Sequence, residues 1–503
     1  MAVPKSILIC GGGTAGWIAA NLMQHAWPNC KIRLIESENI GIIGVGEGST
    51  PALKQFFKRL NIADREWMPQ CNATYKVGIS FPNWSTVKDH ESYFHPFFSE
   101  LDIKPGDPFF YNAKLQRQGI PANAHPDHYF VTAEMARRPA APISEKYAQI
   151  DIDYGYHFDS GLLGEFLKRR AIGLGLEHIV DDIEEIEADV SSGITAVHGK
   201  KVGALVADFY VDCTGFRSLL LQQALEVPFK TYKENLFNDS AVAIATDIDV
   251  SKGIPAETRS TALSAGWAWR IPLVNRYGNG YVYSSDYLTS EEAEAELRQH
   301  LGAHDADKYP ARHLKMKVGR VTEHWKQNCI AIGLSQGFIE PLEATALMLV
   351  QYSIEEFIAA QNEGHVTASE FNHKVNNMME GIRDYIVCHY VTNSRNDSQY
   401  WRDCRAAKRS ENLTKLLNAW DNSDAFEQVL DELDEHLVYI RPSWYVMLMG
   451  VGRFTQAQNQ QAPKASPVFD FQKARGYCEQ LVDDVFPGHN EYLQSIYKER
   501  WPN

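Results

Sequence analysis

The stretch SILICGGGTAGWIAANLMQHAWPNCKIRLIE (residues 6–36) predicts the fold of the first part of the chain. Residues 6–10 form an apolar run typical of a strand, residues 17–27 carry apolar side chains at helix spacing, and residues 31–36 have the pattern of a second strand. A strand, a glycine turn, a helix and a strand make one βαβ unit. We therefore expect an α/β fold with a Rossmann-like domain at this end of the chain.

The turn between the first strand and the helix has the pattern G-x-G-x-x-G. Its first glycine allows a tight turn, the second lets the backbone approach a pyrophosphate, and the third permits close packing of the helix, whose N-terminus favours phosphate. Glu36 follows the last glycine by twenty residues and would accept a ribose hydroxyl. The predicted cofactor contacts are Gly11, Gly13, Thr14, Ala15, Gly16 and Glu36.

Two later strands decide between the dinucleotide cofactors, since NAD and FAD both use this glycine turn. Residues 204–212 are predicted as one strand that ends at Asp212-Cys213-Thr214-Gly215, and residues 329–332 as another that ends at Gly333. In this order, Asp212, Gly215 and Gly333 resemble the later cofactor contacts of two-dinucleotide-type flavoproteins. The order favours FAD.

The rest of the chain has two patterns. Residues 267–273 and 281–283 alternate as in an antiparallel sheet, which would form a substrate-side wall. From Thr345 onward apolar residues recur at helix spacing. We expect two domains: residues 1–345 bind FAD and carry the inserted sheet, and residues 346–503 form a mostly helical subdomain over the substrate site. Residues 455–467 lack periodicity and are expected to be an exposed loop.

The composition excludes several classes of protein. The 503 residues are 44% hydrophobic and 22% charged, with a net charge of −15 and no dense basic run, so nucleic acid is not an expected partner. No apolar run approaches the roughly 20 residues that cross a bilayer, and no signal-peptide pattern is present. The eight cysteines are scattered without a C-x-x-C pair, which fits a cytoplasmic setting. His125 to His128 are interpreted as an exposed loop, and no metal is assigned.

Five segments carry a further pattern. They are residues 13–17 (GTAGW), 44–51 (GVGEGSTP), 72–77 (NATYKV), 266–272 (GWAWRIP) and 337–346 (GFIEPLEATA). Together they resemble the flavin-dependent tryptophan halogenases, whose signature G-W-x-W-x-I-P is matched in full. The resemblance implies the flavin monooxygenase/halogenase type of fold, with residues 44–51 as a strap over the flavin that includes Gly46 and Glu47. Ala344 and Ala346 depart from the family's F-x-E-P-L-E-S-T-G.

The resemblance implies a reaction with two sites. FADH2, O2 and chloride or bromide give hypohalous acid, which then travels to the organic substrate. Lys76 would hold the oxidant, because an ammonium can hydrogen-bond hypohalous acid or form a haloamine. Glu343 would stabilise the cationic ring and take its proton. The halide would bind the backbone at Thr345 and Ala346, where the chain enters a helix.

The resemblance also implies where the substrate binds. His95 and Phe97 are similar to the family's His-x-Phe at the indole site, and Trp444 lies in the region that closes over the substrate in relatives. Trp267 and Trp269 would lie near the flavin and hinder its reduction by a nicotinamide cofactor. Because the two alternate on a strand-like segment, we expect only one of them to face the flavin. A separate NADH-dependent flavin reductase would then supply FADH2. The expected substrate is free tryptophan, indole or a larger indolic compound.

Other interpretations stay open. Taken alone, Lys76 is typical of a surface residue, Glu343 of a first-turn acid, and the aromatic residues of ordinary core packing. A flavin monooxygenase would hydroxylate its substrate without any need of halide. A flavin-binding protein that lost halogenation through Ala344 and Ala346 would bind FAD and give no product. The sequence leaves the oligomeric state open, including a homodimer.

Overall fold

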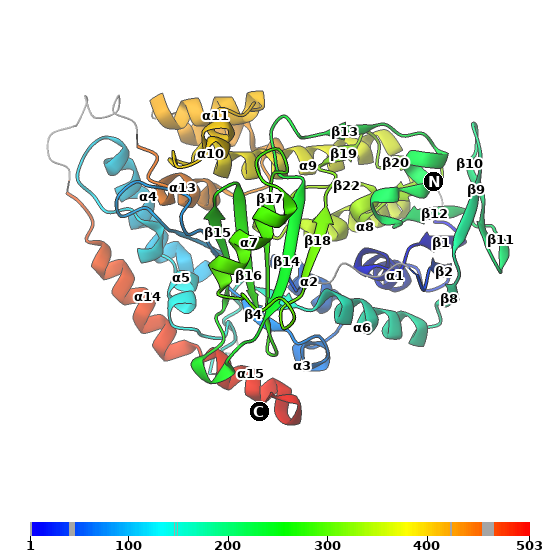
Figure 1. The fold of residues 1–503 in the computed structure, drawn as a ribbon, viewed down its shortest axis with the longest axis horizontal. Helices are drawn as coiled ribbons and strands as arrows, with labels where there is room; N and C mark the ends of the chain where they lie inside the picture. Colours follow the sequence, from blue (N-terminus) through cyan, green and yellow to red (C-terminus); the bar gives the residue numbers. More distant parts are fainter. Residues whose placement is uncertain are drawn as a thin grey trace. The chain divides into compact units, whose positions relative to one another are not determined.

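The computed structural model describes residues 3–39, 46–144, 146–147, 149–422, 425–454 and 467–502 (Figure 1). The chain divides into two compact units. The first unit comprises Met1–Asn72, Phe158–Lys233 and Met316–Glu380, and the second comprises Ala73–His157, Glu234–Lys315 and Gly381–Asn503. Each unit is built from three separate stretches, which differs from the continuous division at residue 345 expected from the sequence.

The first unit is organised around a six-stranded sheet. In spatial order its strands are β20 (Trp325–Lys326), β21 (Cys329–Ala331), β12 (Phe209–Asp212), β1 (Ser6–Cys10), β2 (Lys31–Glu36) and β8 (Glu177–Val180). All neighbours pair in parallel except β20 and β21. The expected βαβ unit is therefore confirmed, and the carboxyl ends of β1, β12 and β21 meet at one edge, where sheets of this kind bind ligands.

Helices and small sheets complete the first unit. α1 (Thr14–Ala26) links β1 to β2 and packs against α6 (Ser160–Gly173) and α8 (Ala346–Glu363). The remaining elements are α2 (Ala52–Arg59), α3 (Asp64–Trp67), β3 (Glu47–Gly48), the sheet of β9 (Ile183–Asp189), β10 (Gly193–Gly199) and β11 (Gly203–Leu205), and the sheet of β13 (Phe229–Thr231), β19 (Gly319–Val321) and β22 (Gly337–Phe338).

Residues 204–212, predicted as one strand, form parts of two strands in different sheets. β11 ends at Leu205, and β12 begins at Phe209. Between them, the Asp208 carboxylate accepts hydrogen bonds from the backbone N–H groups of Lys5 (3.0 Å) and Ser6 (2.9 Å). The prediction was wrong because the apolar pattern continues through a turn whose acid is bound to the start of β1.

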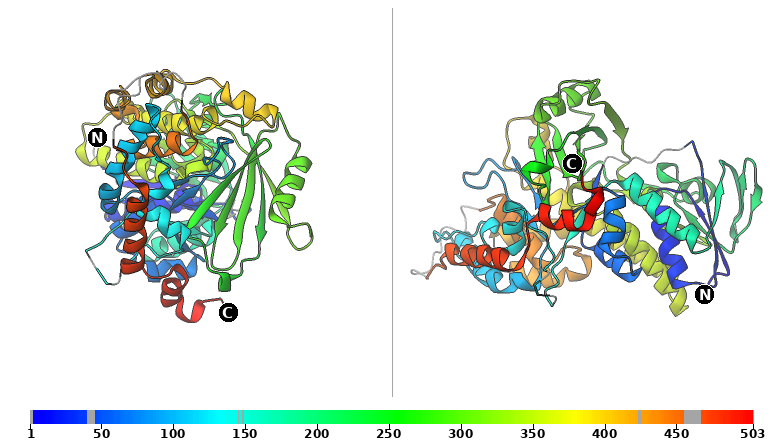
Figure 2. Two further views of the ribbon diagram at one scale, coloured as in Figure 1. Left: turned by 90° about the vertical axis from the view of Figure 1, so that its left-hand side faces the viewer. Right: turned by 90° about the horizontal axis from the view of Figure 1, so that it is seen from below.

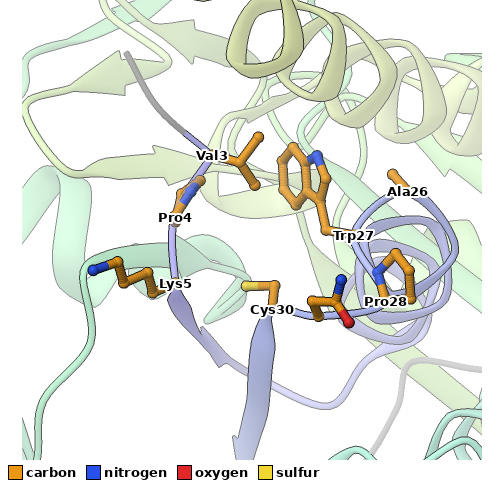
Figure 3. Close-up of a pocket in the computed structure, with 8 residues that line it drawn as sticks. Val3, Pro4, Lys5, Ala26, Trp27, Pro28 and Cys30 are labelled. Carbon is orange, nitrogen blue, oxygen red and sulfur yellow. The ribbon is translucent and has the colours of Figure 1, made fainter.

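A pocket of about 370 Å³ lies beside the start of β1 and is lined by residues 3–5 and 26–30 (Figure 3). Within it, Trp27 donates its indole N–H to the Asn362 side chain at 2.8 Å. Since these residues precede β1 or lie at and just after the C-terminal end of α1, the pocket is at the amino end of the parallel strands. It is therefore on the side away from the edge where a ligand is expected.

The second unit contains a seven-stranded sheet. In spatial order its strands are β18 (Ala311–Lys315), β14 (Ser240–Thr246), β17 (Tyr277–Tyr283), β16 (Gly266–Pro272), β15 (Glu257–Leu263), β5 (Gly78–Ser80) and β6 (Phe94–Pro96). Only β15 and β5 pair in parallel among these neighbours of the described chain, so the expected antiparallel sheet is confirmed. α7 (Ser290–Leu301) packs on β14 and β17 (Figure 2).

Helices make up most of the remainder of the chain. α9 (Ala368–Val391) passes from the first unit into the second. The second unit also holds α4 (Ile103–Arg117), α5 (Val131–Arg137), α10 (Gln399–Arg405), α11 (Glu411–Asn422), α12 (Phe426–Glu432), α13 (Arg441–Gly450), α14 (Phe471–Val485) and α15 (His489–Tyr497), with β4 (Thr74–Lys76) and all but the last residue of β7 (Gly155–Phe158). The mostly helical C-terminal part is thus confirmed. Residues 455–466, expected as a loop, lie outside the described residues.

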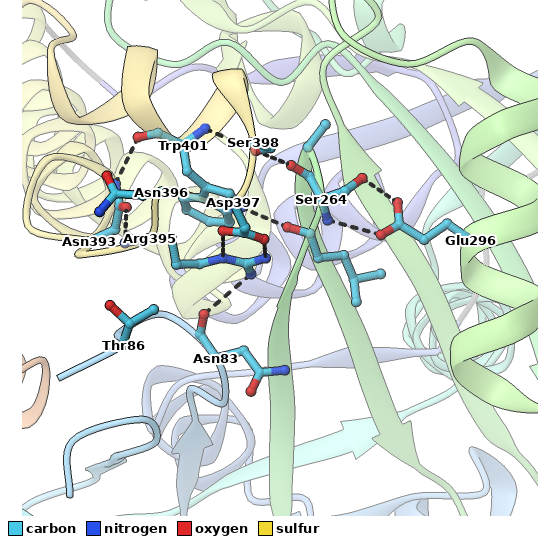
Figure 4. Close-up of polar contacts among 12 residues, drawn as sticks. Asn83, Thr86, Ser264, Glu296, Asn393, Arg395, Asn396, Asp397, Ser398 and Trp401 are labelled. Carbon is cyan, nitrogen blue, oxygen red and sulfur yellow. Dashed lines mark hydrogen bonds and ion pairs between the residues drawn. The ribbon is translucent and has the colours of Figure 1, made fainter. Parts of the chain in front are cut away.

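The segment between α9 and α10 is bound to the sheet of the second unit by polar contacts (Figure 4). The Arg395 guanidinium pairs with Asp397 and donates to the carbonyl oxygen of Asn83. Ser398 donates to the carbonyl oxygen of Ser264 at 2.7 Å, and the Ser264 hydroxyl donates to Glu296 of α7 at 2.6 Å. These contacts join the later helices to the sheet through side chains that are distant in sequence.

The described part of the chain lacks membrane-spanning helices, disulfides and clusters of metal-binding side chains. Within it, none of the helices has the length and apolar character that crossing a membrane requires. No disulfide joins any of the eight cysteines, all of which are in described ranges. His, Cys, Asp and Glu side chains of these ranges form no group of three that could hold a metal.

Residues 126–128, predicted as part of an exposed loop, form a short 3₁₀ helix. Pro126 is buried and the His128 ring packs on Phe471, so the prediction of an exposed loop was wrong.

Candidate cofactor and substrate sites

In the glycine turn after β1, neighbouring backbone leaves no room for a side chain at Gly11 and Gly16, whereas there is room at Gly13. Gly11 has a φ of +114°, and a Cβ there would lie 2.2 Å from the carbonyl oxygen of Cys213. A Cβ on Gly16 would lie 2.0 Å from the carbonyl oxygen of Gly11. Gly13 has an extended backbone, with φ −70°, and no atom lies within 4 Å of the position of its Cβ. The backbone at the N-terminus of α1 is therefore accessible to a phosphate group at Gly13.

Glu36, at the end of β2, is held beside this turn. Its Oε1 accepts hydrogen bonds from the Lys168 ammonium (2.7 Å) and from His178 Nε2 (2.8 Å). Its Oε2 lies so close to Gly12 that a Cβ there would overlap it, at 1.5 Å. The carboxylate is thus oriented by the Lys168 ammonium and the His178 ring, and it lies next to the backbone of Gly12.

Asp212, at the end of β12, organises the loop that follows it. Its carboxylate is buried and accepts six hydrogen bonds of 2.6 to 3.2 Å. The donors are the backbone N–H groups of Thr214, Leu220 and Leu221 and the hydroxyl groups of Thr214, Ser218 and Ser335. The side chain predicted to contact the cofactor is therefore engaged in shaping the loop that carries Gly215.

Two glycines connect the later strands to the turn. Gly215 has a φ of +70°, and no atom lies within 4 Å of its Cβ position. Gly333, after β21, has a φ of +69°, and a Cβ there would lie 2.8 Å from the Cβ of Ala15. The structure thus brings the three strand ends together around α1. The open backbone at Gly13 and Gly215, the helix N-terminus and the carboxylate of Glu36 fit the adenosine diphosphate part of FAD.

The predicted strap is described from Gly46 onward, and Gly44 and Val45 lie outside the described residues. Gly46 is buried with a φ of +88°. Burial raises the pKa of Glu47 from 4.5 to about 7, opposed by a hydrogen bond with Ser160 and assisted by the charge of Asp159. Glu47 is therefore protonated over part of the neutral range.

A pH-dependent stability follows from Glu47. Because its pKa is higher in the folded chain than in the unfolded chain, ionisation of Glu47 favours the unfolded chain: the fold has its full stability with respect to this group below about pH 4.5, and that stability is lost as the pH rises through about 7. We expect Glu47→Gln to be more stable than the parent at about pH 8 by about 1 kcal/mol, and equally stable at about pH 4, measured by thermal unfolding of the apoprotein. The same difference at both pH values would contradict this assignment.

Lys76 lies on β4, opposite Gly155 of β7. Its side chain is 0% exposed, and its ammonium lies 5.3 Å from the centre of the Phe97 ring. Burial and, next, the Lys76 charge hold the pKa of His157 well below its usual range, so the neighbouring imidazole is neutral. Its two ring nitrogens contact the hydroxyls of Thr74 (3.1 Å) and Thr258 (2.9 Å). Lysine is rarely buried, so this position calls for a chemical reason.

Aromatic side chains of the second unit gather around His95, which lies on β6. His95 Nε2 is 3.5 Å from the Tyr385 hydroxyl. The Tyr385 ring stacks on Tyr439, with centroids 3.6 Å apart, and meets Trp444 edge-on at 4.9 Å. Phe97 follows β6 and faces Lys76. Sequence reasoning missed Tyr385 and Tyr439, because a tyrosine on an apolar helix face or in a connecting segment has no local mark of a site.

Trp267 and Trp269 lie on β16. The prediction that their side chains lie on opposite faces of the strand was wrong. Residues two apart in a strand project to the same face. The two rings are accordingly neighbours, with centroids 6.3 Å apart. Gly280 of β17 lies under the second ring, because a Cβ there would be 2.1 Å from Trp269. Both tryptophans therefore belong to one buried surface of the second unit.

Glu343, Thr345 and Ala346 surround the start of α8 in the first unit. Glu343 ends a 3₁₀ helix (Pro341–Glu343) and is buried. Ala344 is in the left-handed region with a φ of +58°, and Thr345 is the N-cap of α8, which starts at Ala346 as expected. The N–H groups of a helix's first turn have no partner within the helix and attract anions. Thr345 is buried and Ala346 is exposed.

The model of the tryptophan halogenase family matches residues 6–467. The chain belongs to the tryptophan halogenase family. It is 35% identical to the tryptophan 6-halogenase SttH of Streptomyces toxytricini, over 98% of each chain, and 37% identical to the 7-chloro-L-tryptophan 6-halogenase KtzR of Kutzneria sp. (strain 744), over 97% of this chain and 98% of KtzR.

Solved structures of flavin-dependent halogenases have the same fold as this chain. The crystal structure of SttH matches with a TM-score of 0.85 at 34% identity, covering 98% of this chain and 100% of that chain. Tar14, a tryptophan C-6 flavin-dependent halogenase from taromycin biosynthesis, matches with a TM-score of 0.83 at 32% identity, covering 98% of this chain and 99% of Tar14. The protein is a flavin-dependent halogenase, and its mixed α/β fold with a helical C-terminal part is that of its relatives.

Proposed function

We propose that this halogenase uses FADH2, O2 and chloride or bromide to halogenate an indolic small molecule. The observation that carries the proposal is the fully buried Lys76, whose ammonium lies 5.3 Å from the Phe97 ring. A desolvated ammonium next to a ring can hold hypohalous acid by a hydrogen bond, or as a haloamine, and present the halogen to an electron-rich aromatic substrate. His95, Phe97 and Trp444 would bind that substrate through their rings.

The proposed roles of the other residues follow from their positions within each unit. The reduced cofactor, FADH2, would supply the electrons that reduce oxygen when it is bound. Gly11, Gly13, Thr14, Ala15 and Gly16 would hold its pyrophosphate, Glu36 its ribose, and Gly46, Glu47, Asp212, Gly215 and Gly333 the surrounding segments. Thr345 and Ala346 would bind the halide through backbone N–H groups. Glu343 would accept the proton that leaves the halogenated ring.

The two buried tryptophans, Trp267 and Trp269, suggest how the flavin is reduced. Trp267 and Trp269 form one surface and would hinder access of a nicotinamide cofactor to the flavin. A separate NADH-dependent flavin reductase would then deliver FADH2. The relatives named above act on tryptophan or 7-chlorotryptophan, so free tryptophan is a substrate to test beside indole and larger indolic compounds.

The test is an assay of the purified protein with FAD, a flavin reductase, NADH and O2, and with indole or tryptophan as substrate. Bromide and chloride are supplied separately, and the products are identified by mass spectrometry. A halogenated product that requires halide is the expected result. A hydroxylated product that forms without halide would instead indicate a monooxygenase. FAD binding without any product from tryptophan, indole or larger indoles would favour a flavin-binding protein that has lost halogenation.

A further inference from the structure

β4, which carries Lys76, is an outer strand: β7 pairs with one of its edges, and β4 is the last strand in the spatial order of its sheet. The backbone groups on the other edge therefore need partners outside that sheet. The Tyr75 N–H, immediately before Lys76, donates to Nε2 of His489 at 3.2 Å. The Val77 N–H, immediately after it, donates to the carbonyl oxygen of Ala256 at 2.8 Å. Lys76 thus lies between two residues whose backbone is bound to other elements.

His489, the first residue of α15, bridges β4 to the segment that leads into β15. Its side chain is 1% exposed. Its Nδ1 lies 2.8 Å from the carbonyl oxygen of Ile254, which can only accept, so Nδ1 carries the ring hydrogen. Nε2 is then unprotonated and accepts the Tyr75 N–H. The ring is therefore neutral and in one tautomer. Burial favours this state, because it lowers the pKa of His489 from 6.5 to about 4, opposed by the bond to Ile254.

The imidazole takes the place of a missing rung between two strands. β5 and β15 pair in parallel, and the residues just before them, Val77 and Ala256, still share a direct backbone bond. Two residues further back, the same register places Tyr75 opposite Ile254. There the connection runs through the ring of His489, which accepts from one residue and donates to the other. The strand that carries the buried lysine is thus held by a side chain 414 residues away in the sequence.

We propose that His489 is a positioning residue, which fixes the backbone of β4 so that Lys76 presents its ammonium to the substrate. The inference rests on the proposed function, because it takes Lys76 as the residue that holds the oxidant. A displacement of roughly 1 Å in a reacting group can cost about 10²-fold in rate. α15 makes a second contact with this part of the chain, since the Tyr497 hydroxyl donates to the carbonyl oxygen of Ala73 at 2.8 Å. Loss of the His489 bridge alone should therefore shift β4 without releasing the helix.

The test compares His489→Leu with His489→Gln. Leucine fills the position and removes both ring nitrogens, whereas the glutamine amide can accept from Tyr75 and donate to Ile254. The readouts are kcat and KM for indole or tryptophan, and the halogenated product formed per FADH2 consumed. His489→Leu is expected to lower kcat and this yield at least about tenfold, with KM and FAD affinity near those of the parent. His489→Gln is expected to regain most of the parental kcat.

A matched control lies next to His489 on α15. The Asn490 side chain accepts the Ile254 N–H at 2.8 Å and donates to the carbonyl oxygen of Val250 at 2.6 Å. It therefore anchors the same helix to the same segment, and neither bond involves β4. Asn490→Leu should lower the unfolding temperature of the apoprotein, as His489→Leu does, and should keep the parental kcat and yield. The assays are run below the unfolding temperatures of both variants.

A third substitution keeps the inference testable if His489→Leu does not fold. In His489→Asn the shorter amide reaches the position of Nδ1, so it keeps the bond to Ile254 and loses the bond to Tyr75. This variant should anchor α15 and still show the loss of kcat and yield.

A parental kcat and yield in the folded leucine or asparagine variant of His489 would overturn the inference. An equal loss of both in Asn490→Leu would also overturn it, because the ring would then serve only to anchor the helix. A His489→Gln protein as impaired as His489→Leu would contradict the bridging role. Parental halogenation by Lys76→Met would instead overturn the proposed function of Lys76, so the two failures are separate results.

Discussion

Replacing Lys76 by methionine is expected to reduce the rate of halogenation by a factor on the order of 10³. Methionine has a similar length and is apolar, so it fills the buried position on β4 without a charge. The proposed haloamine or hydrogen-bonded oxidant needs a nitrogen, and the variant has none beside Phe97. The rate is measured by mass spectrometry of the product formed from indole or tryptophan.

A second readout separates a chemical role of Lys76 from a structural one. If Lys76 acts after the oxidant has formed, Lys76→Met should still consume FADH2 and O2 and should still halogenate a soluble, electron-rich trap added in excess. Its FAD affinity should equal that of the parent, because the glycine turn belongs to the other unit. Lys76→Arg keeps the charge but not the compact ammonium and should also be impaired. A Lys76→Met protein that retains most of the parental rate would rule out the proposed role.

Replacing Gly13 by aspartate is expected to weaken FAD binding by a factor on the order of 10² or more, without loss of apoprotein stability. The position has an extended backbone and no atom within 4 Å of its Cβ, so the fold accepts a side chain. Gly13 is also the N-cap of α1, where aspartate is among the preferred residues. In the complex, the carboxylate would occupy the space of the pyrophosphate and repel its charge.

Two companion variants show which effect dominates. Gly13→Asn has nearly the same size without the charge, so its smaller loss of affinity would measure the steric part. Gly16→Ala places a Cβ 2.0 Å from the Gly11 carbonyl oxygen, and should therefore destabilise the apoprotein itself. Affinity is measured by flavin fluorescence and stability by thermal unfolding. Parental FAD affinity in Gly13→Asp would mean that the pyrophosphate does not approach this residue.

Local patterns predicted the parts of the fold in which neighbouring residues interact. The apolar run of residues 6–10, the helix spacing of residues 17–27 and the strand pattern of residues 31–36 correspond to β1, α1 and β2, and the start of α8 was expected within one residue. The same reasoning failed where the decisive contact is distant in sequence. Residues 204–212 are divided by the bond of Asp208 to the start of β1, some 200 residues away.

The candidate site also has features that short motifs predict and features that depend on contacts distant in sequence. The glycine spacing and the motif around Lys76 can be read from the chain, because they are short and depend on residue type alone. That Gly13 is open while Gly11 is closed depends on the carbonyl oxygen of Cys213, and that Asp212 shapes a loop depends on donors as far away as Ser335. The stacking of Tyr385 on Tyr439 joins a helix to a segment more than 50 residues later.

The amino-acid sequence was sufficient for the βαβ unit, the family and the kind of chemistry, since each depends on short motifs in which the residues act on their immediate neighbours. The tertiary structure was needed for the two discontinuous units, for the complete burial of Lys76 and for the bond between Tyr75 and His489. Burial and hydrogen-bond pairing are properties of segments that meet only after the chain has folded, so no local pattern encodes them.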